Sequence, residues 1–176
     1  MKTITLYLDM DGVLADFHKE YVKYDPDKSD RKKFRASVMD HKIFEKLDFM
    51  PDTQELLNHV KHLANSGIHV EILTSMGTHD PIQGAEAKRQ KTAWLQAHGI
   101  PYKPNFVRNK QEKSAYATPT SILVDDSPGC ISPFIEKGGH GILHHKASET
   151  IRILDSTILQ IRAINAWDFR TNYTMD

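Results

Sequence analysis

The sequence has little cysteine, no long apolar run and no excess of charge of either sign. Its one cysteine, Cys130, can neither form an internal disulfide nor anchor a thiolate metal cluster. No run of 18 apolar residues occurs, and the first residues lack the basic and then apolar pattern of a leader peptide. These features predict a protein of the reducing cytoplasm that does not bind membranes.

The balance of charge and the length set further limits. Lys+Arg and Asp+Glu both number 23, so no net field draws the chain toward nucleic acid, although a local basic patch remains compatible with this balance. A chain of 176 residues with 39% hydrophobic content is long enough for one domain with a proper core and a small insertion.

The most informative stretch is Asp9-Met10-Asp11-Gly12-Val13, which follows the apolar run Ile-Thr-Leu-Tyr-Leu at 4–8. That run predicts a buried strand, and acids two residues apart at its end would face the same way. Adjacent carboxylates repel each other, and a bound cation with a nucleophile and acid pair would explain their presence. An EF-hand calcium loop is excluded, because Val13 and Leu14 occupy the positions that need an oxygen ligand and a glycine.

Apolar strands alternate with amphipathic helices along the rest of the chain. Strands are predicted at 4–8, 68–73, 105–107, 121–124 and 141–143, and helices at 16–24, 51–65, 81–98, 128–137 and 147–164. Such alternation predicts an α/β fold, a three-layer sandwich around a mostly parallel five-stranded sheet with right-handed crossovers.

Segment 25–39 interrupts this pattern with dense mixed charge and predicts a small, partly helical insertion. It is interpreted either as a charged surface helix or as a patch that attracts phosphate. The patch would consist of Arg31, Lys32, Lys33 and Arg35.

Polar residues follow the predicted strands at the edge where reactive groups collect in such sheets. The first strand leads into Asp9 and Asp11, the second into Thr74 and Ser75, and the fourth into Asp125-Asp126. Several acids in one crevice predict a hard divalent cation, and Mg²⁺ suits them because it leaves positions for water and phosphate. A hydroxyl and a lysine could hold phosphate oxygens beside it.

The motif Asp-Met-Asp-Gly-Val-Leu-Ala-Asp-Phe at 9–17, with the threonine, a lysine and the paired aspartates in order, resembles the haloacid dehalogenase (HAD) superfamily of phosphohydrolases. Within this superfamily, the motif is most similar to that of the 5'(3')-deoxyribonucleotidase branch. The resemblance covers residues 3–145 and implies a Mg²⁺-dependent phosphomonoesterase with an aspartyl-phosphate intermediate. It also implies a Rossmann-like core at 1–16 and 51–176 and a small helical cap at 17–50.

The resemblance also implies roles for particular residues. Asp9 matches the nucleophile, and Asp11 matches the general acid/base whose backbone carbonyl reaches the metal in relatives. Thr74, followed by Ser75, matches the hydroxyl that binds phosphate. The four acids would hold the metal: Asp9, Asp11, Asp125 and Asp126.

The phosphate-binding lysine has two candidates. Lys113 begins a short predicted helix and stands twelve residues before the acidic pair, close to the interval usual in the family, so it is preferred. Lys110, directly after the third strand, is the alternative.

The insertion in these enzymes selects the leaving group. Phe17 matches an aromatic that holds the nucleobase in the deoxyribonucleotidase branch, and Phe44 and Phe49 are further candidates. The alternative is that these aromatics only build the core.

Three functions follow. The first is a nucleotidase for deoxyribonucleoside monophosphates. The second is a phosphatase for other small phosphates or nucleic-acid ends, the only way in which nucleic acid is expected to bind. The third is a binding or regulatory module without turnover.

Two smaller signals lie outside this motif set. His140, His144 and His145 cluster near the fifth strand, but no acid or cysteine accompanies them at ligand spacing, so zinc is not expected. Cys130 lies where a helix N-terminus could activate it, yet a buried packing role is the interpretation that we favour.

Overall fold

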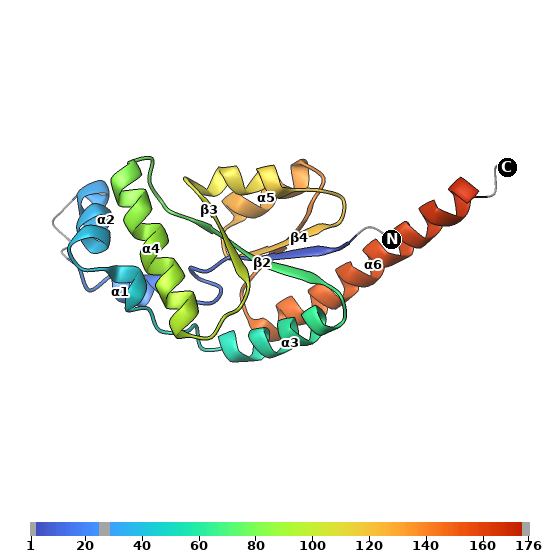
Figure 1. The fold of residues 1–176 in the computed structure, drawn as a ribbon, viewed down its shortest axis with the longest axis horizontal. Coiled ribbons are helices and arrows are strands. Elements are labelled where there is room, and N and C mark those ends of the chain that lie inside the picture. The colour runs from blue at the N-terminus through green and yellow to red at the C-terminus, as the bar shows by residue number, and fades with distance from the viewer. Residues whose placement is uncertain (1–2, 25–28, 174–176) are drawn as a thin grey trace.

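The computed structural model describes the backbone of residues 3–24 and 29–173, and the side chains within these ranges up to Trp167. Its centre is a five-stranded sheet formed by β1 (Thr5–Leu8), β2 (His69–Ser75), β3 (Lys103–Val107), β4 (Ser121–Asp125) and β5 (His140–Leu143). The strands are all parallel in the order β3-β2-β1-β4-β5 (Figure 1). The sheet therefore has β1 at its centre, with β2 and β4 on either side.

Helices cover both faces of the sheet and complete the three layers. One face carries α3 (Thr53–Asn65), α4 (Pro81–Ala97) and α6 (Ala147–Tyr173), and the other carries α5 (Pro128–Glu136) with the 3₁₀ helix η2 (Lys110–Tyr116) (Figure 1). Alternate residues of β1 serve the two cores: Leu6 and Leu8 are fully buried under the first set of helices, whereas Tyr7 packs with the second. The predicted Rossmann-like α/β sandwich is confirmed.

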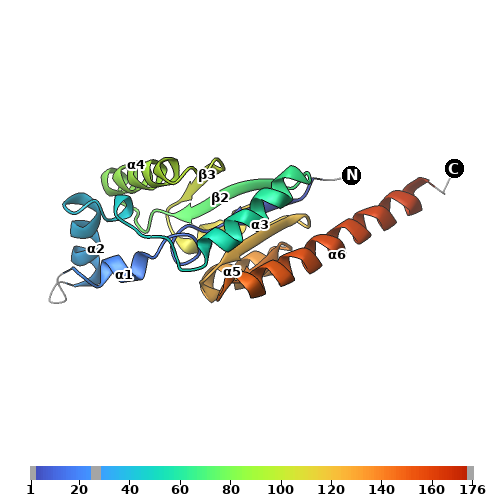
Figure 2. The same ribbon diagram turned by 90° about the horizontal axis from the view of Figure 1, so that it is seen from below.

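Several elements differ in extent from the sequence prediction. Strand β2 continues through Ser75, because Thr74 and Ser75 still pair with Phe106 and Val107 of β3. Strand β3 begins at Lys103, two residues early, and as an edge strand it accommodates Pro104. Helix α6 continues to Tyr173 rather than ending at residue 164, and its C-terminal part projects from the body (Figure 2).

The segment 17–50 forms three short helices beside the carboxyl edge of the sheet. They are α1 (Phe17–Tyr21), α2 (Asp30–Met39) and η1 (Ile43–Glu45). The chain enters and leaves this segment side by side, because Asp16 N–H donates to Asp48 O at 2.9 Å and Met50 N–H donates to Leu14 O at 3.0 Å. Backbone hydrogen bonds therefore hold the start and the end of the segment together.

Helix α4 anchors this segment through buried polar groups. Gln90 Nε2 donates to Val38 O at 2.7 Å, and Phe44 N–H donates to Gln90 Oε1 at 3.2 Å. Further along the helix, Trp94 Nε1 donates to Leu47 O at 2.8 Å. Since these bonds are buried, they fix the insertion against the core more firmly than exposed ones would.

None of the helices in the described ranges has a stretch whose length and hydropathy would let it span a bilayer.

Candidate active site

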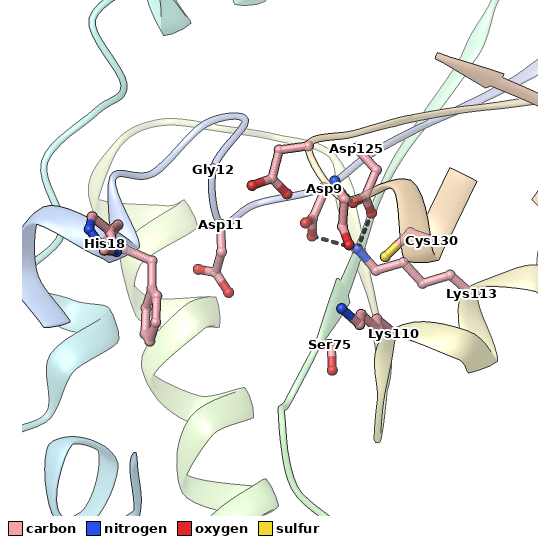
Figure 3. Close-up of a pocket in the computed structure, with 12 residues that line it drawn as sticks. Asp9, Asp11, Gly12, His18, Ser75, Lys110, Lys113, Asp125 and Cys130 are labelled. Carbon is pink, nitrogen blue, oxygen red and sulfur yellow. Dashed lines mark hydrogen bonds and ion pairs between the residues drawn. The ribbon is translucent and has the colours of Figure 1, made fainter. Parts of the chain in front are cut away.

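A cavity of about 420 Å³ opens at the carboxyl edge of the sheet, between the core and the insertion. Segments far apart in the sequence meet here, because parallel strands place all their carboxyl ends at one edge. Figure 3 shows its lining: Asp9, Asp11, Gly12, Phe17, His18, Ser75, Lys110, Lys113, Asp125, Asp126, Ser127 and Cys130.

Three of the four predicted metal ligands come together. Carboxylate oxygens of Asp9, Asp125 and Asp126 all lie within 4.8 Å of one another. The backbone of Gly12 makes room for them: its φ is +80°, and a Cβ built there would lie 2.2 Å from Asp126 Oδ2. Any side chain at position 12 would therefore collide with this acid as well as strain the turn.

Lys113 is the cation of the cluster. It is 1% exposed, and its Nζ lies 2.6 Å from Asp125 Oδ2 and 2.8 Å from Asp9 Oδ1. Burial alone would lower the pKa of this lysine, but the carboxylates of Asp9 and Asp125 outweigh burial and raise it above its ordinary value. The lysine therefore stays charged. Lys110 is exposed at the rim of the cavity, so the structure brings Lys113 and not Lys110 against the acids (Figure 3).

The acids keep an excess of negative charge despite this lysine. Burial, and then repulsion from Asp9, raise the pKa of Asp125, although Lys113 opposes both. The same two causes raise the pKa of Asp126 to about 6. Asp9 Oδ1 is buried and accepts no aligned hydrogen bond from the described residues, since its contact with Lys113 is an ion pair only.

A divalent cation fits this site. The repelling oxygens would become ligands, and the donor set of carboxylates is the one that Mg²⁺ prefers. Asp125 is already oriented, because its Oδ1 accepts the Ser127 N–H at 2.9 Å and its Oδ2 accepts Lys113. The residues that would hold the ion are Asp9, Asp125 and Asp126.

The carboxylate of Asp11 stands apart from this cluster. Figure 3 shows its side chain directed away from the contact between Asp9, Lys113 and Asp125. Its Oδ2 accepts Lys91 Nζ of α4 at 2.5 Å. Burial raises its pKa, and the attraction of Lys91 opposes this shift. A metal contact through the backbone carbonyl of Asp11 stays a prediction.

The two hydroxyls at the end of β2 have different surroundings. Thr74 is fully buried and its Oγ1 accepts Lys91 Nζ at 2.7 Å, so it does not line the cavity. Ser75 does line it, and its Oγ accepts the N–H of Gly77 at 3.0 Å. The role of Thr74 in phosphate binding stays a prediction, and Ser75 is the hydroxyl that the cavity exposes.

The three aromatic residues predicted to hold a nucleobase lie in three different places. Phe17 lines the cavity and stacks on Tyr21, with ring centroids 5.0 Å apart. Phe44 is 1% exposed and packs between Phe17 and Lys91, as the core interpretation expects. Phe49 lines a different cavity and packs on the edge of Trp94.

Sequence reasoning missed two residues near the site, Lys91 and His18. Lys91 was missed because the prediction for 81–98 was a helix alone, with no role for its side chains. A signal existed, because Lys91 is in helical register with the buried Ala87 and Trp94. His18, which lines the cavity, carried no comparable signal for substrate binding. Lys110, the alternative candidate for the phosphate-binding lysine, also lines the cavity.

Cys130 is buried, and two of the histidines near β5 form hydrogen bonds within the chain. Cys130 is 2% exposed, and burial raises the pKa of its thiol to about 12, so it is not an activated nucleophile. His144 Nδ1 hydrogen-bonds to Thr150 Oγ1 at 2.8 Å, and His140 Nε2 to Pro119 O at 3.1 Å.

Solved structures align with this chain at low sequence identity. A hydrolase from Streptococcus pneumoniae aligns with a TM-score of 0.52 and 13% identity over 88% of this chain and 100% of its own. D,D-heptose 1,7-bisphosphate phosphatase from Burkholderia thailandensis has a TM-score of 0.47 and 15% identity over 86% of this chain and 85% of its own. An uncharacterized protein from Corynebacterium glutamicum has a TM-score of 0.47 and 17% identity over 89% of this chain and 96% of its own.

No protein-family model and no curated protein sequence matches the chain. The alignment with the Streptococcus pneumoniae hydrolase supports a common fold, and at 13% identity it leaves the reaction to be argued from the site.

Proposed function

We propose that this chain is a phosphomonoesterase of the HAD superfamily that works through an aspartyl-phosphate. The observation that carries the proposal is the grouping of Asp9, Asp125 and Asp126 around one point, with the buried Lys113 against two of them. This arrangement is complementary to a phosphoryl group held through a divalent cation, which would offset the charge on its oxygens.

The chain's own residues supply the two chemical steps. A carboxylate oxygen of Asp9 attacks phosphorus, the bond from phosphorus to the ester oxygen breaks, and Asp11 gives its proton to the departing alcohol. Water then attacks the phosphorus of the aspartyl-phosphate and loses a proton to Asp11. The bond to Asp9 breaks, and inorganic phosphate leaves. Lys113 stays charged and binds phosphate oxygens in both steps.

Burial of Asp11 supports its part in this scheme. A raised pKa keeps a larger fraction of a carboxyl protonated near neutral pH, as a proton donor requires. Asp11 lines the same cavity as Asp9, which lies two residues earlier in the chain, as a shared substrate requires (Figure 3).

For the substrate we propose a deoxyribonucleoside monophosphate. Phe17 offers an aromatic face at the cavity that Ser75 and His18 also line, and such faces stack on nucleobases. In this proposal the segment 17–50 is the cap that covers the leaving group, and Mg²⁺ is the cofactor.

A second candidate is a phosphatase for nucleic-acid ends or other small phosphates. A further cavity of about 530 Å³ lies between α2 and the loop after β2, lined by Arg31, Arg35 and Phe34 among others. Arg35 is partly neutralised by Asp80, 3.2 Å away. Cations there would attract a phosphate backbone, which favours this candidate over a wholly closed nucleotide site.

A substrate panel with Mg²⁺ tests these proposals. It contains deoxyribonucleoside 5'- and 3'-monophosphates, sugar phosphates and 3'-phosphorylated oligonucleotides. We expect the highest kcat/KM for the mononucleotides, and activity lost in EDTA. A preference for the oligonucleotides or sugar phosphates would support the second candidate. No turnover on any substrate, with EDTA leaving the melting temperature unchanged, would support a module without catalysis.

A further inference from the structure

Lys91 occupies a position that a lysine rarely takes. It lies in the second half of α4 and is 0% exposed, in register with the buried Ala87 and Trp94. Burying an ammonium group is unfavourable unless the group is fully paired, because it loses its hydration. A methionine or leucine would fill this volume without that cost, so the charge itself needs a reason.

The ammonium group joins three separate parts of the chain. It donates to Asp11 Oδ2 at 2.5 Å in the first loop and to Thr74 Oγ1 at 2.7 Å at the end of β2. It also lies 4.4 Å from the ring centroid of Phe44, which belongs to the insertion. An ammonium has three N–H donors, and these two acceptors with one aromatic face use them all.

Asp11 and Thr74, the two acceptors, each keep one polar group that the contact with Lys91 does not use. Asp11 Oδ1 accepts no hydrogen bond from the described residues, although Oδ2 is held. Thr74 accepts through its oxygen and keeps its hydroxyl hydrogen as a donor. Asp11 lines the cavity, whereas Lys91 does not, so the lysine acts behind the surface that meets substrate.

We infer that Lys91 is a positioning residue, which fixes the carboxyl of Asp11 for proton transfer and links that carboxyl to the cap through Phe44. The inference rests on the proposed function, because it assigns Asp11 a proton to move. A misplacement of about 1 Å in such a group can cost about 10²-fold in rate. Lys91 would thus contribute to turnover without touching the substrate.

A double-mutant cycle separates this role from a merely structural one. Lys91→Met is made in the natural chain and in Asp11→Asn, and kcat and KM are measured with a deoxyribonucleoside monophosphate and with p-nitrophenyl phosphate. We expect Lys91→Met to lower kcat for the nucleotide by about 10²-fold, with KM changed by less than about threefold. With p-nitrophenyl phosphate, whose leaving group needs little protonation, the loss should be smaller. In the Asp11→Asn background, the second substitution should lower kcat no further.

Lys88→Met is the matched control. Lys88 is on the same helix, is exposed and also lies over an aromatic ring, that of Phe106 at 5.4 Å, but it does not line the cavity. Its removal should leave kcat unchanged. If Lys91→Met does not fold, Lys91→Gln keeps a donor at the same place and enters the same cycle, with a smaller expected loss.

Failure of this inference and failure of the proposed function would give different results. Equal loss from Lys91→Met in both backgrounds, or the same loss for both leaving groups, would overturn the inference while the proposed function stands. Absence of turnover by the natural chain across the whole panel would overturn the proposed function, and this inference with it.

Discussion

Lys113 Nζ lies 2.6 Å from Asp125 Oδ2, and neither group is more than 1% exposed. The lysine comes from η2 and the aspartate from the end of β4, twelve residues later. A third charge, on Asp9, is 2.8 Å from the same nitrogen. One cation therefore compensates two buried anions, and the balance of charge in the site depends on Lys113.

Lys113→Met should destabilise the fold. Loss of one partner of a buried pair costs about 3 to 5 kcal/mol, because the remaining charge stays buried and unpaired. Urea unfolding at neutral pH measures the free energy. Lys110→Met is the control: this lysine is exposed at the cavity rim, and its loss should change the free energy of unfolding by less than about 0.5 kcal/mol. Similar losses in both variants would contradict the pairing described above.

Asp9→Asn should abolish turnover and keep the fold. The amide has the shape of the carboxylate but neither its charge nor its nucleophilicity. We expect kcat to fall by more than about 10³-fold, as in other enzymes deprived of a nucleophile. Circular dichroism checks the fold, and trapping of a phosphorylated chain with the natural protein checks the intermediate. Substantial turnover by the variant would exclude Asp9 as nucleophile.

Mg²⁺ should stabilise the folded chain. A ligand at 100 times its Kd adds about 2.7 kcal/mol, or about 5 to 10 °C in melting temperature for a domain of this size. Thermal melts with Mg²⁺ and with EDTA measure the difference. Asp125→Asn should reduce the response strongly. A response that is equal in this variant would place the ion elsewhere.

Gly12→Ala should disturb the metal site specifically. The new Cβ would fall 2.2 Å from Asp126 Oδ2 and displace that carboxylate. Gly67→Ala is a matched control, because Gly67 also has a positive φ of 90°, but no atom of the described residues lies within 4 Å of a Cβ there. Both variants should lose some stability from backbone strain. Only Gly12→Ala should lose the rise in melting temperature with Mg²⁺.

The stability of the metal-free chain should fall as pH rises through the window set by Asp126. Burial and the neighbouring acids raise its folded pKa to about 6, whereas an unfolded aspartate titrates near about 3.9. Between about pH 4 and 6 the folded state binds more protons, so unfolding becomes easier with increasing pH. Melts in EDTA across this range should show a shallower decline for Asp126→Asn. An identical slope in the variant would contradict the raised pKa.

The sequence was sufficient to predict the sheet and the acidic cluster, and the reason is geometrical. Parallel strands carry whatever follows them to one edge, so Asp9 and Asp125 had to be neighbours once β1 and β4 were adjacent. Lys113 could be anticipated only from its interval to the acidic pair, which the resemblance supplied.

Other features depended on packing that one sequence does not reveal. Thr74 is covered because α4 brings Lys91 over it, and no local pattern specifies where a helix lies on a sheet. Phe44 could have faced a ligand or the core, and at 1% exposure, packed against Lys91, it belongs to the core. In both cases the missing information is the placement of α4.

The projecting end of α6 has a consequence for how the molecule moves in solution. A helix of 27 residues is about 40 Å long, and its later part carries Ile164 and Trp167 at 59% and 70% exposure (Figure 2). A compact chain of this length would have a radius of gyration of about 16 Å. Small-angle scattering should therefore report a larger radius, and rotational diffusion should be slower about the short axes than about the long one.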